Sequence, residues 1–400
     1  MISVTRRLTS ITRVTAGVLL FGLVTAVQPV VATASAAPPA HSAPAAYSAA
    51  YSASPPAISA SPPAISAAPA SSAAPPATSA APAAKRTAIV AIGDSAASGE
   101  GAGDYEAGTR GEKGDWCHRS THTYIRHTGL ASTAVNLACS GATSANVGFG
   151  TAVHDTEGSQ ARRLAQIART YRVTTVVAQF GANDDPSFGS SVVRCVVVFL
   201  NPSLPGCAST LSAQWPKRVA AMAPKVTKAL GDVRAAMRQA GYRDEDYVLV
   251  LASYASPVTE TMTRTHGFTG CPYRAEDAKW GRTAAVPQLS DALRGVADKV
   301  DARFLDLSRA AEGHEACTSA GPEWERRLTV DPKVFAQGGP GAAGHLAQES
   351  FHPNTAGHAQ LASCLAAFVR GGQAHGQCIP GNDGKLHVEA GDAKPRILAR

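Results

Sequence analysis

Three short polar segments each follow an apolar run that is long enough to form a buried strand. They offer a hydroxyl at Ser95, an unhindered backbone N–H at Gly141 and a side-chain amide at Asn183. The apolar runs that precede them are 88–92, 134–138 and 173–180. Because the carboxyl ends of parallel strands meet at one edge of a sheet, we expect the three groups to converge there. Together they could attack a carbonyl carbon and stabilise the oxyanion that forms.

The base that this chemistry needs is offered near the end of the chain. His352 stands just before a proline, and a helix is expected to begin near Asn354, so the imidazole would be held between a loop and a helix start. Glu349 lies three residues upstream, close enough to bend back and accept a hydrogen bond from the imidazole. The simpler interpretation of the first segment is a polar turn in which Asp94 or Ser95 caps the next helix. We expect Asp94 to be a structural residue of this turn and Ser95 to be the reactive one.

Four motifs of the chain resemble the four blocks of the SGNH (GDSL-type) hydrolases, and they occur in the same order. The motifs are Gly-Asp-Ser at 93–95, Gly141, Gly-x-Asn-Asp at 181–184 and His-Pro at 352–353. Each motif alone is weak, but all four in order behind matching strands are specific. The segment GDSAASGEGAGDY, followed by Cys-His-Arg-Ser at 117–120, resembles secreted actinobacterial esterases and lipases of this family. Ala96 replaces the leucine that usually follows Gly-Asp-Ser, at a position that performs no chemistry.

The resemblance implies a role for each of these residues. Ser95 would be the nucleophile and His352 the general base and acid, and the reaction would pass through an acyl-serine that water then hydrolyses. The oxyanion would be held by the backbone N–H groups of Ser95 and Gly141 and by the side chain of Asn183. Glu349 occupies the position of the family's usual aspartate, and we expect it to orient the imidazole. The alternative, used by some relatives, is a main-chain carbonyl in that place.

Strands and helices alternate along the chain, which predicts an α/β fold with a parallel sheet covered on both sides. Two further strands are expected at 247–251 and 303–307, and Pro224 would kink a long helix or mark its start. The segments 186–216 and 253–280 are expected to be loops. Helices are expected at 159–169, 219–237, 289–300 and from residue 354 onward. The prediction is a flavodoxin-like three-layer α/β/α sandwich with a five-stranded parallel sheet, which the resemblance also implies.

Composition divides the chain into four parts. Residues 1–37 combine an arginine-containing start, an apolar stretch and a small-residue site, which is typical of a secretory signal peptide, with an uncleaved anchor as the alternative. Residues 38–84 are low-complexity Ala, Pro and Ser and are expected to form a disordered linker. The catalytic domain is expected at 85–380, and 381–400 is expected to be a polar tail. Residues 1–37 hold three arginines and no acid, so without them the formal net charge falls from +7 to +4. This charge is too mild and too scattered to indicate nucleic-acid binding.

All eight cysteines lie within the expected catalytic domain. An even number behind a secretory signal indicates disulfides rather than metal ligands, and no Cys-x-x-Cys pair supports a zinc site. Spacing alone leaves the connectivity open. Pairing neighbours in the sequence closes the shortest loops, and the resemblance to the actinobacterial enzymes implies the same pairing. The cysteines are Cys117, Cys139, Cys195, Cys207, Cys271, Cys317, Cys364 and Cys378.

The function expected from these features is that of a secreted serine esterase or lipase that hydrolyses carboxylic esters without a metal or cofactor. A carbohydrate deacetylase of the acetylxylan type would use the same chemistry. A non-catalytic, envelope-associated binding protein is the alternative from another class. The apolar run at 196–200 favours a lipid or small ester as substrate, because it could form an apolar pocket wall. We expect a monomer that contacts a cell envelope or lipid surface only transiently.

Two minor features complete the analysis. The segment 100–105 lies close to the nucleophile in the sequence, and its glycines and acids are expected to shape the substrate entrance. His118, His122 and His127 are clustered, but no acidic or cysteine partner at ligand spacing joins them. We therefore interpret them as ordinary surface or helix histidines.

Overall fold

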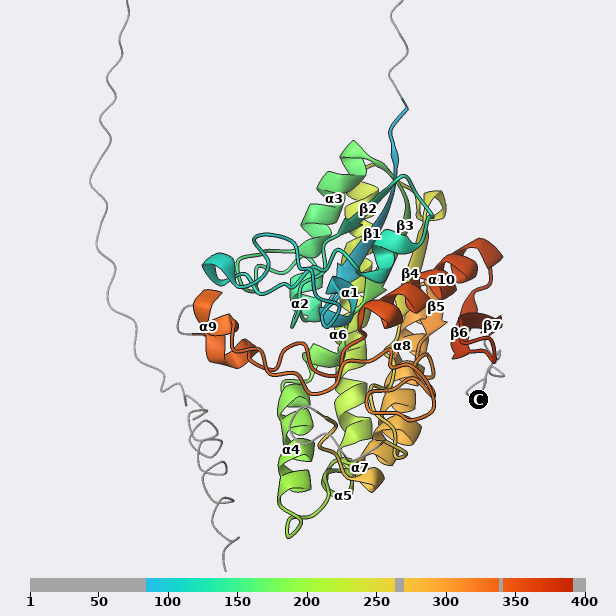
Figure 1. The fold of residues 1–400 in the computed structure, drawn as a ribbon. Coiled ribbons are helices and arrows are strands. Elements are labelled where there is room, and N and C mark those ends of the chain that lie inside the picture. Colours follow the sequence, from blue (N-terminus) through green and yellow to red (C-terminus); the bar gives the residue numbers. More distant parts are fainter. Residues whose placement is uncertain (1–83, 263–269, 338–340, 391–400) are drawn as a thin grey trace, which may run out of the picture. The chain divides into compact units, whose positions relative to one another are not determined.

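The computed structural model describes residues 84–262, 270–337 and 341–390, and its centre is one seven-stranded sheet (Figure 1). The strands are β1 (Thr87–Gly93), β2 (Thr133–Asn136), β3 (Arg172–Gln179), β4 (Val248–Ala252), β5 (Arg303–Asp306), β6 (His375–Pro380) and β7 (Leu386–Ala390). Their order is β2-β1-β3-β4-β5-β6-β7, and only the last pair is antiparallel. The expected signal peptide, nearly all of the expected linker and residues 391–400 lie outside the described residues.

The first five strands follow the flavodoxin-like order that the sequence predicts. The chain moves from β1 to one side to form β2, and then to the other side of β1 to form β3. In such a sheet, ligands bind outside the carboxyl ends of the strands at this change of direction. The ends of β1 and β3 are therefore the place where a site is expected.

The side chains of β1 alternate between the two faces of the sheet, and helices cover both faces. Ala88, Val90 and Ile92 pack in one cluster with residues of α3 (Gln160–Thr170), α6 (Trp215–Gln239) and α8 (Val286–Lys299). Ile89 and Ala91 pack on the opposite face with residues of α10 (Thr355–Gly371) and the 3-10 helix η3 (Tyr124–His127). All five side chains are fully buried, so β1 is a central strand of the predicted three-layer sandwich.

The prediction of five strands was too low, because the chain adds a hairpin at the edge of the sheet. β6 and β7 extend the sheet beyond β5, and β7 lies in the segment that was expected to be a polar tail. Leu386 is the buried residue of β7 and packs with α10, while the Cys364–Cys378 disulfide joins α10 to β6. One buried leucine in a polar segment is too weak a pattern to reveal a strand.

The expectation of a loop at 186–216 was also wrong. This segment forms α4 (Phe188–Leu200) and α5 (Cys207–Leu211), and the Cys195–Cys207 disulfide joins the two helices. The valines of α4 have modest helix propensity, and the uninterrupted apolar run at 196–200 obscures its helical period. The guanidinium of Arg274 donates hydrogen bonds to carbonyl oxygens at the end of α4 and just after it, those of Val198, Asn201 and Leu204.

Two further helix predictions need correction. α6 begins at Trp215, with a proline in its first turn, and continues through Pro224, so Pro224 is not its start. The segment 253–280, expected to be a loop, contains α7 (Ala275–Trp280), which continues through a π-helical turn into α8. Among the described residues, no helix is both long enough and apolar enough to cross a membrane.

The four disulfides confirm the sequential pairing. The bonds join Cys117 to Cys139, Cys195 to Cys207, Cys271 to Cys317, and Cys364 to Cys378. All eight cysteines are therefore paired, and the chain has no free thiol.

Candidate active site

Ser95 stands at a sharp turn that requires glycine at position 93. Gly93 has φ +143°, and a Cβ atom on it would lie 2.0 Å from the carbonyl oxygen of Gln179 on the neighbouring strand. Asp94 then caps the short helix α1 (Ser95–Ser98), because its carboxylate accepts a hydrogen bond from the N–H of Ala96 at 3.1 Å. Ser95 is the first residue of this helix, where a backbone N–H has no partner within the helix.

Asp94 is held in place by contacts with the turn and with a residue that the sequence did not single out. The hydroxyl of Tyr254 donates a hydrogen bond of 2.6 Å to its carboxylate. Burial raises the pKa of Asp94 to about 7, although the hydrogen bonds from Tyr254 and Ala96 act in the opposite direction. These contacts fit the expected role of Asp94 as a structural residue of the turn.

His352 faces Ser95 across the end of β1. Its Nε2 lies 2.8 Å from the hydroxyl oxygen of Ser95, and its Nδ1 lies 3.0 Å from the carbonyl oxygen of Ser350. A carbonyl can only accept a hydrogen bond, so Nδ1 carries the proton in the neutral ring and Nε2 is free to accept the proton of Ser95. Burial lowers the pKa of His352, and the negative charge of Glu100 opposes that effect. The imidazole therefore has the tautomer that a general base requires.

The expectation that Glu349 orients the imidazole is not supported by the geometry. The carboxylate of Glu349 accepts a hydrogen bond from the hydroxyl of Tyr105 at 2.8 Å and pairs with Arg326 at 3.2 Å. The Nδ1 atom of His352 is instead engaged by the main chain at Ser350, which was the stated alternative. The contacts with Tyr105 and Arg326 hold the Glu349 carboxylate away from the ring, so its negative charge raises the pKa of His352 only through space.

Gly141 and Asn183 lie on the other side of Ser95. Gly141 has φ +82°, and a Cβ atom on it would lie 3.0 Å from the Nε2 atom of His154, so a side chain would crowd this turn. The side-chain amide of Asn183 donates one hydrogen bond of 3.2 Å to the carbonyl oxygen of Ala142, which leaves its second N–H available. Ser95, Gly141, Asn183 and His352 all border the same cavity.

The neighbouring Asp184 fixes the turn that carries Asn183. Its carboxylate accepts hydrogen bonds from the backbone N–H and the hydroxyl of Ser144, at the start of α2 (Ser144–Val147). Lys225 of α6 donates a hydrogen bond of 2.8 Å to the carbonyl oxygen of Asp184. The bonds with Ser144 join the start of α2 to the turn after β3, so the groups expected to form an oxyanion hole are held in a fixed arrangement.

The cavity at Ser95 has a volume of about 510 Å3, which is in the range of ligand sites, and it is mainly apolar. Its walls come from α4, α5, α6, α7, α8 and the loop after β4. The apolar side chains that line it include Phe188, Val192, Leu211, Trp215, Val258 and Trp280. The run at 196–200, expected to form a wall, does not line it, because the earlier turns of α4 face the cavity.

The comparison with known proteins agrees with this arrangement. A model of the GDSL-like lipase/acylhydrolase family matches residues 91–360. The chain belongs to this family. Lipase 2 of Streptomyces coelicolor is 26% identical to it over 280 residues, which cover 68% of this chain and 82% of Lipase 2. As a GDSL-like acylhydrolase, the protein is a serine hydrolase that cleaves carboxylic esters through an acyl-enzyme.

Two solved structures are also similar. The extracellular lipase of Streptomyces rimosus is 22% identical, with a TM-score of 0.45 and coverage of 68% of this chain and 94% of that protein. The phospholipase A1 of Streptomyces albidoflavus is 20% identical, with a TM-score of 0.45 and coverage of 69% of this chain and 95% of that protein.

Behind the imidazole, this GDSL-like hydrolase has a buried polar network that sequence reasoning missed. Glu100 is fully buried, and its carboxylate lies 2.8 Å from the Nδ1 atom of His118 and 3.2 Å from the hydroxyl of Tyr105. Gln348 donates a further hydrogen bond of 2.8 Å to it. Burial alone would raise the pKa of Glu100, but the hydrogen bond and charge of His118 lower it; the same pairing raises the pKa of His118 against the effect of burial. The burial of a single acidic residue produces no periodic pattern in the sequence, so the sequence gives no sign that Glu100 is buried.

Two expectations about this region were therefore wrong. His118 is buried in an ion pair rather than lying at the surface. The segment 100–105 packs behind His352 rather than at the substrate entrance, since a Cβ atom on Gly101 would lie 2.9 Å from the Cβ atom of His352. His127 is exposed, as predicted, and His122, partly exposed, pairs with the carboxylate of Asp104 at 2.7 Å.

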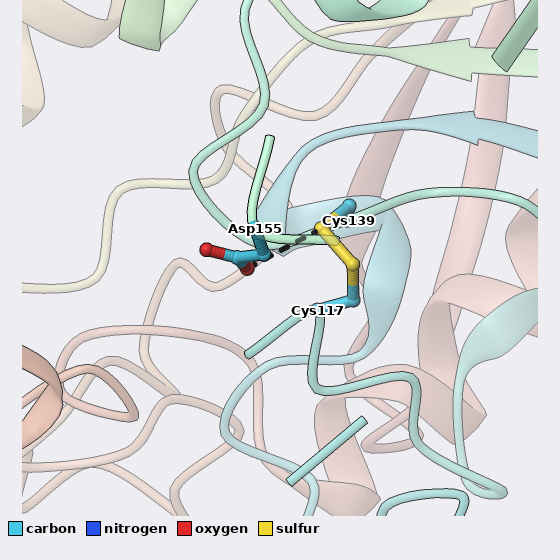
Figure 2. Close-up of side chains that lie close together, drawn as sticks. All are labelled: Cys117, Cys139 and Asp155. Atoms are coloured by element: carbon cyan, nitrogen blue, oxygen red, sulfur yellow. Dashed lines mark hydrogen bonds between the residues drawn. A yellow bond between two sulfur atoms is a disulfide. The ribbon is translucent and has the colours of Figure 1, made fainter. Parts of the chain in front are cut away.

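The cysteine and acidic groups that lie close enough to hold a metal do not form a metal site. Figure 2 shows Asp155 beside the Cys117–Cys139 disulfide, with 3.8 Å between its carboxylate and the sulfur of Cys139. Since both sulfurs are in a disulfide, neither can act as a thiolate ligand. A second group contains the same Cys117, and its Glu157 is paired with Arg119. Within the described ranges, these groups are structural.

Proposed function

We propose that Ser95 is the nucleophile and His352 the general base and acid of this ester hydrolase, and that its substrates are lipid esters. The observation that carries the proposal is the contact of 2.8 Å between the Ser95 hydroxyl and Nε2 of His352, at the border of an apolar cavity. The oxyanion would be stabilised by the backbone N–H groups of Ser95 and Gly141 and by the free N–H of the Asn183 amide.

The reaction follows from the proton positions. Nε2 of His352 takes the proton of Ser95 as its oxygen attacks the carbonyl carbon, and the imidazolium then gives that proton to the departing alcohol. Water repeats the sequence on the acyl-serine, which releases the carboxylic acid and restores the hydroxyl. The carbonyl oxygen of Ser350 accepts from Nδ1 throughout, so it orients the ring and favours the imidazolium through its dipole. The side chain of Glu349 has no direct part in these steps, because it is engaged by Tyr105 and Arg326.

The cavity favours an acyl chain over a sugar. Its lining is mostly aliphatic and aromatic, so an acyl chain bound there would remove apolar surface from water. A glycan would require many hydrogen-bonding groups along its length. The relative named Lipase 2 supports the same choice. We therefore favour a lipase or esterase over a carbohydrate deacetylase.

The assignment is tested by hydrolysis of p-nitrophenyl esters from acetate to palmitate, with acetylated xylan in parallel, using the full chain purified from a secreting host. We expect medium or long acyl chains to be preferred, and Ser95→Ala to lose activity on the order of 10³-fold or more. Activity that survives in Ser95→Ala would reject the nucleophile. Preference for acetylated xylan would favour the deacetylase, and no turnover of any ester would favour a non-catalytic binding protein.

Secretion and domain limits are part of the same proposal. The signal-like composition of residues 1–37 supports export, and the four disulfides fit an oxidising compartment. We propose that 38–84 is a linker and that the catalytic domain begins near residue 85 and extends at least to Ala390, beyond the limit of 380 first expected, because β7 completes the sheet. The working form would be a monomer.

A further inference from the structure

The outer side of α4 is unusually apolar for a helix at the surface. Only Cys195 and Val198 of its 13 residues are buried. A helix that is apolar on all sides is normally enclosed by protein, so the exposure of α4 requires an explanation. The segment from 188 to 211 has a single charged residue, Arg194, and no acidic residue.

Four exposed aliphatic side chains form what we call the α4 outer face. Their exposed fractions are 55% for Val193, 37% for Val197, 47% for Leu200 and 38% for Leu204. The first three are spaced four and three residues apart, so they share one side of the helix. Leu204 follows shortly after the helix, where Arg274 binds its carbonyl oxygen at 2.9 Å. The Cys195–Cys207 disulfide also links α4 to α5, so the α4 outer face belongs to two covalently cross-linked helices.

The opposite side of α4 forms part of the cavity that contains Ser95. Phe188, Val192 and Cys195 line that cavity. Figure 1 shows α4 and α5 beyond the carboxyl ends of the strands, where the catalytic turns lie. One helix thus separates an apolar cavity, suited to an acyl chain, from an apolar outer face.

We propose that the α4 outer face docks on the surface of aggregated lipid, so that lipid esters reach Ser95 directly from that surface. This inference rests on the proposed lipid-ester activity, and it adds the surface from which the enzyme takes its substrate. The docked face would lie one helix away from the apolar cavity that contains Ser95. The sole charge, Arg194, is positive and is compatible with phosphate headgroups, and the absence of acids avoids repulsion by them.

Docking is tested separately from catalysis with the Ser95→Ala chain and phosphatidylcholine vesicles. We expect the protein to float with the vesicles, and Val193→Ser/Val197→Ser in the same background to bind at least about tenfold more weakly. The matched control is Val153→Ser/Val330→Ser, which also removes two exposed valines, 67% and 53% exposed, from outside the face and the cavity lining. Leu204→Ser, outside the helix, provides a second variant that leaves α4 intact.

The same substitutions in the active enzyme complete the test. We expect turnover of soluble p-nitrophenyl acetate to remain unchanged, which shows that α4 is folded, while hydrolysis of vesicle lipid falls at least about tenfold. Equal binding by the two double variants, or no binding by the parent chain, would overturn the proposal. A concentration-dependent dimer that the outer-face variant abolishes would assign the face to a second copy. Vesicle binding without turnover of any ester would instead reject the lipid-ester activity and leave docking standing.

Discussion

The Nδ1 atom of His352 lies 3.0 Å from the carbonyl oxygen of Ser350, two residues earlier in the same loop. The group that orients the imidazole is therefore part of the main chain. A serine hydrolase with a side-chain acid holds a full negative charge at this position, whereas a carbonyl offers a dipole. The negative charge of Glu100 raises the pKa of His352, and the charge of Glu349 has a weaker effect in the same direction.

Glu349→Gln is expected to reduce kcat/KM by less than about tenfold, because the side chain does not contact the imidazole. Loss of the orienting acid in a Ser-His-Asp site costs about 10⁴-fold. The change also weakens the pairing with Arg326, so thermal unfolding should be measured beside the rate on a soluble ester. A loss of 10³-fold or more in a protein that still unfolds cooperatively would show that Glu349 acts on the ring during catalysis.

The pH profile of kcat/KM should report the lowered pKa of His352. The base must be neutral, so activity rises as the pH passes this pKa, and the acidic limb should lie below the ordinary 6.5. Glu100→Gln removes a negative charge that raises the pKa of His352, so the limb should move to still lower pH. Glu349→Gln should move it less in the same direction. The rates can be followed at the isosbestic wavelength of p-nitrophenol, and a limb that moves upward in Glu100→Gln would contradict this account.

Gly101→Ala and Gly103→Ala form a matched pair. Both glycines have positive φ, +85° and +71°, so alanine costs each about 1–2 kcal/mol of backbone strain. Only at position 101 would the new methyl meet another residue, the Cβ atom of His352 at 2.9 Å; at 103 nothing lies within 4 Å. Urea unfolding should therefore show a loss of stability in both variants. Activity should fall clearly in Gly101→Ala alone, and equal activity would mean that the imidazole is not positioned by this segment.

Asp94→Asn is expected to change how stability depends on pH. The folded-state pKa of about 7 lies above the ordinary 3.8, so the folded protein binds the proton more tightly and loses stability as pH rises from about 4 to about 7. Asparagine does not titrate, so relative to the parent the variant should gain up to about 4 kcal/mol across this interval. Urea unfolding at pH 4, 6 and 8 measures the difference. A difference that is constant with pH would show that Asp94 is ionised throughout.

The turns that border the candidate site could be predicted from the sequence better than the structures between them. The turns at Ser95, Gly141 and Asn183 follow strands with strong apolar runs, so the parallel sheet alone brings them together. Glu349 was expected to orient His352, but the contact is made by the main chain at Ser350. A main-chain carbonyl has no residue type by which a sequence could reveal it. α4 was missed because the uninterrupted apolar run at 196–200 obscures its helical period, and its position depends on a disulfide and on Arg274, far away in the chain. Glu100 was missed because burial of one acid depends on partners that only the fold assembles.

The antiparallel strand β7 has a consequence for the whole chain in solution. Without it, β6 would leave a row of unpaired N–H and carbonyl groups along the sheet edge, open to strand addition by another molecule. β7 covers that row, and as the new edge strand it carries the exposed polar and charged side chains His387 and Glu389, which discourage further strand addition. A chain that stops after Pro380 should therefore keep the turns around Ser95 and yet aggregate through the bare edge of β6.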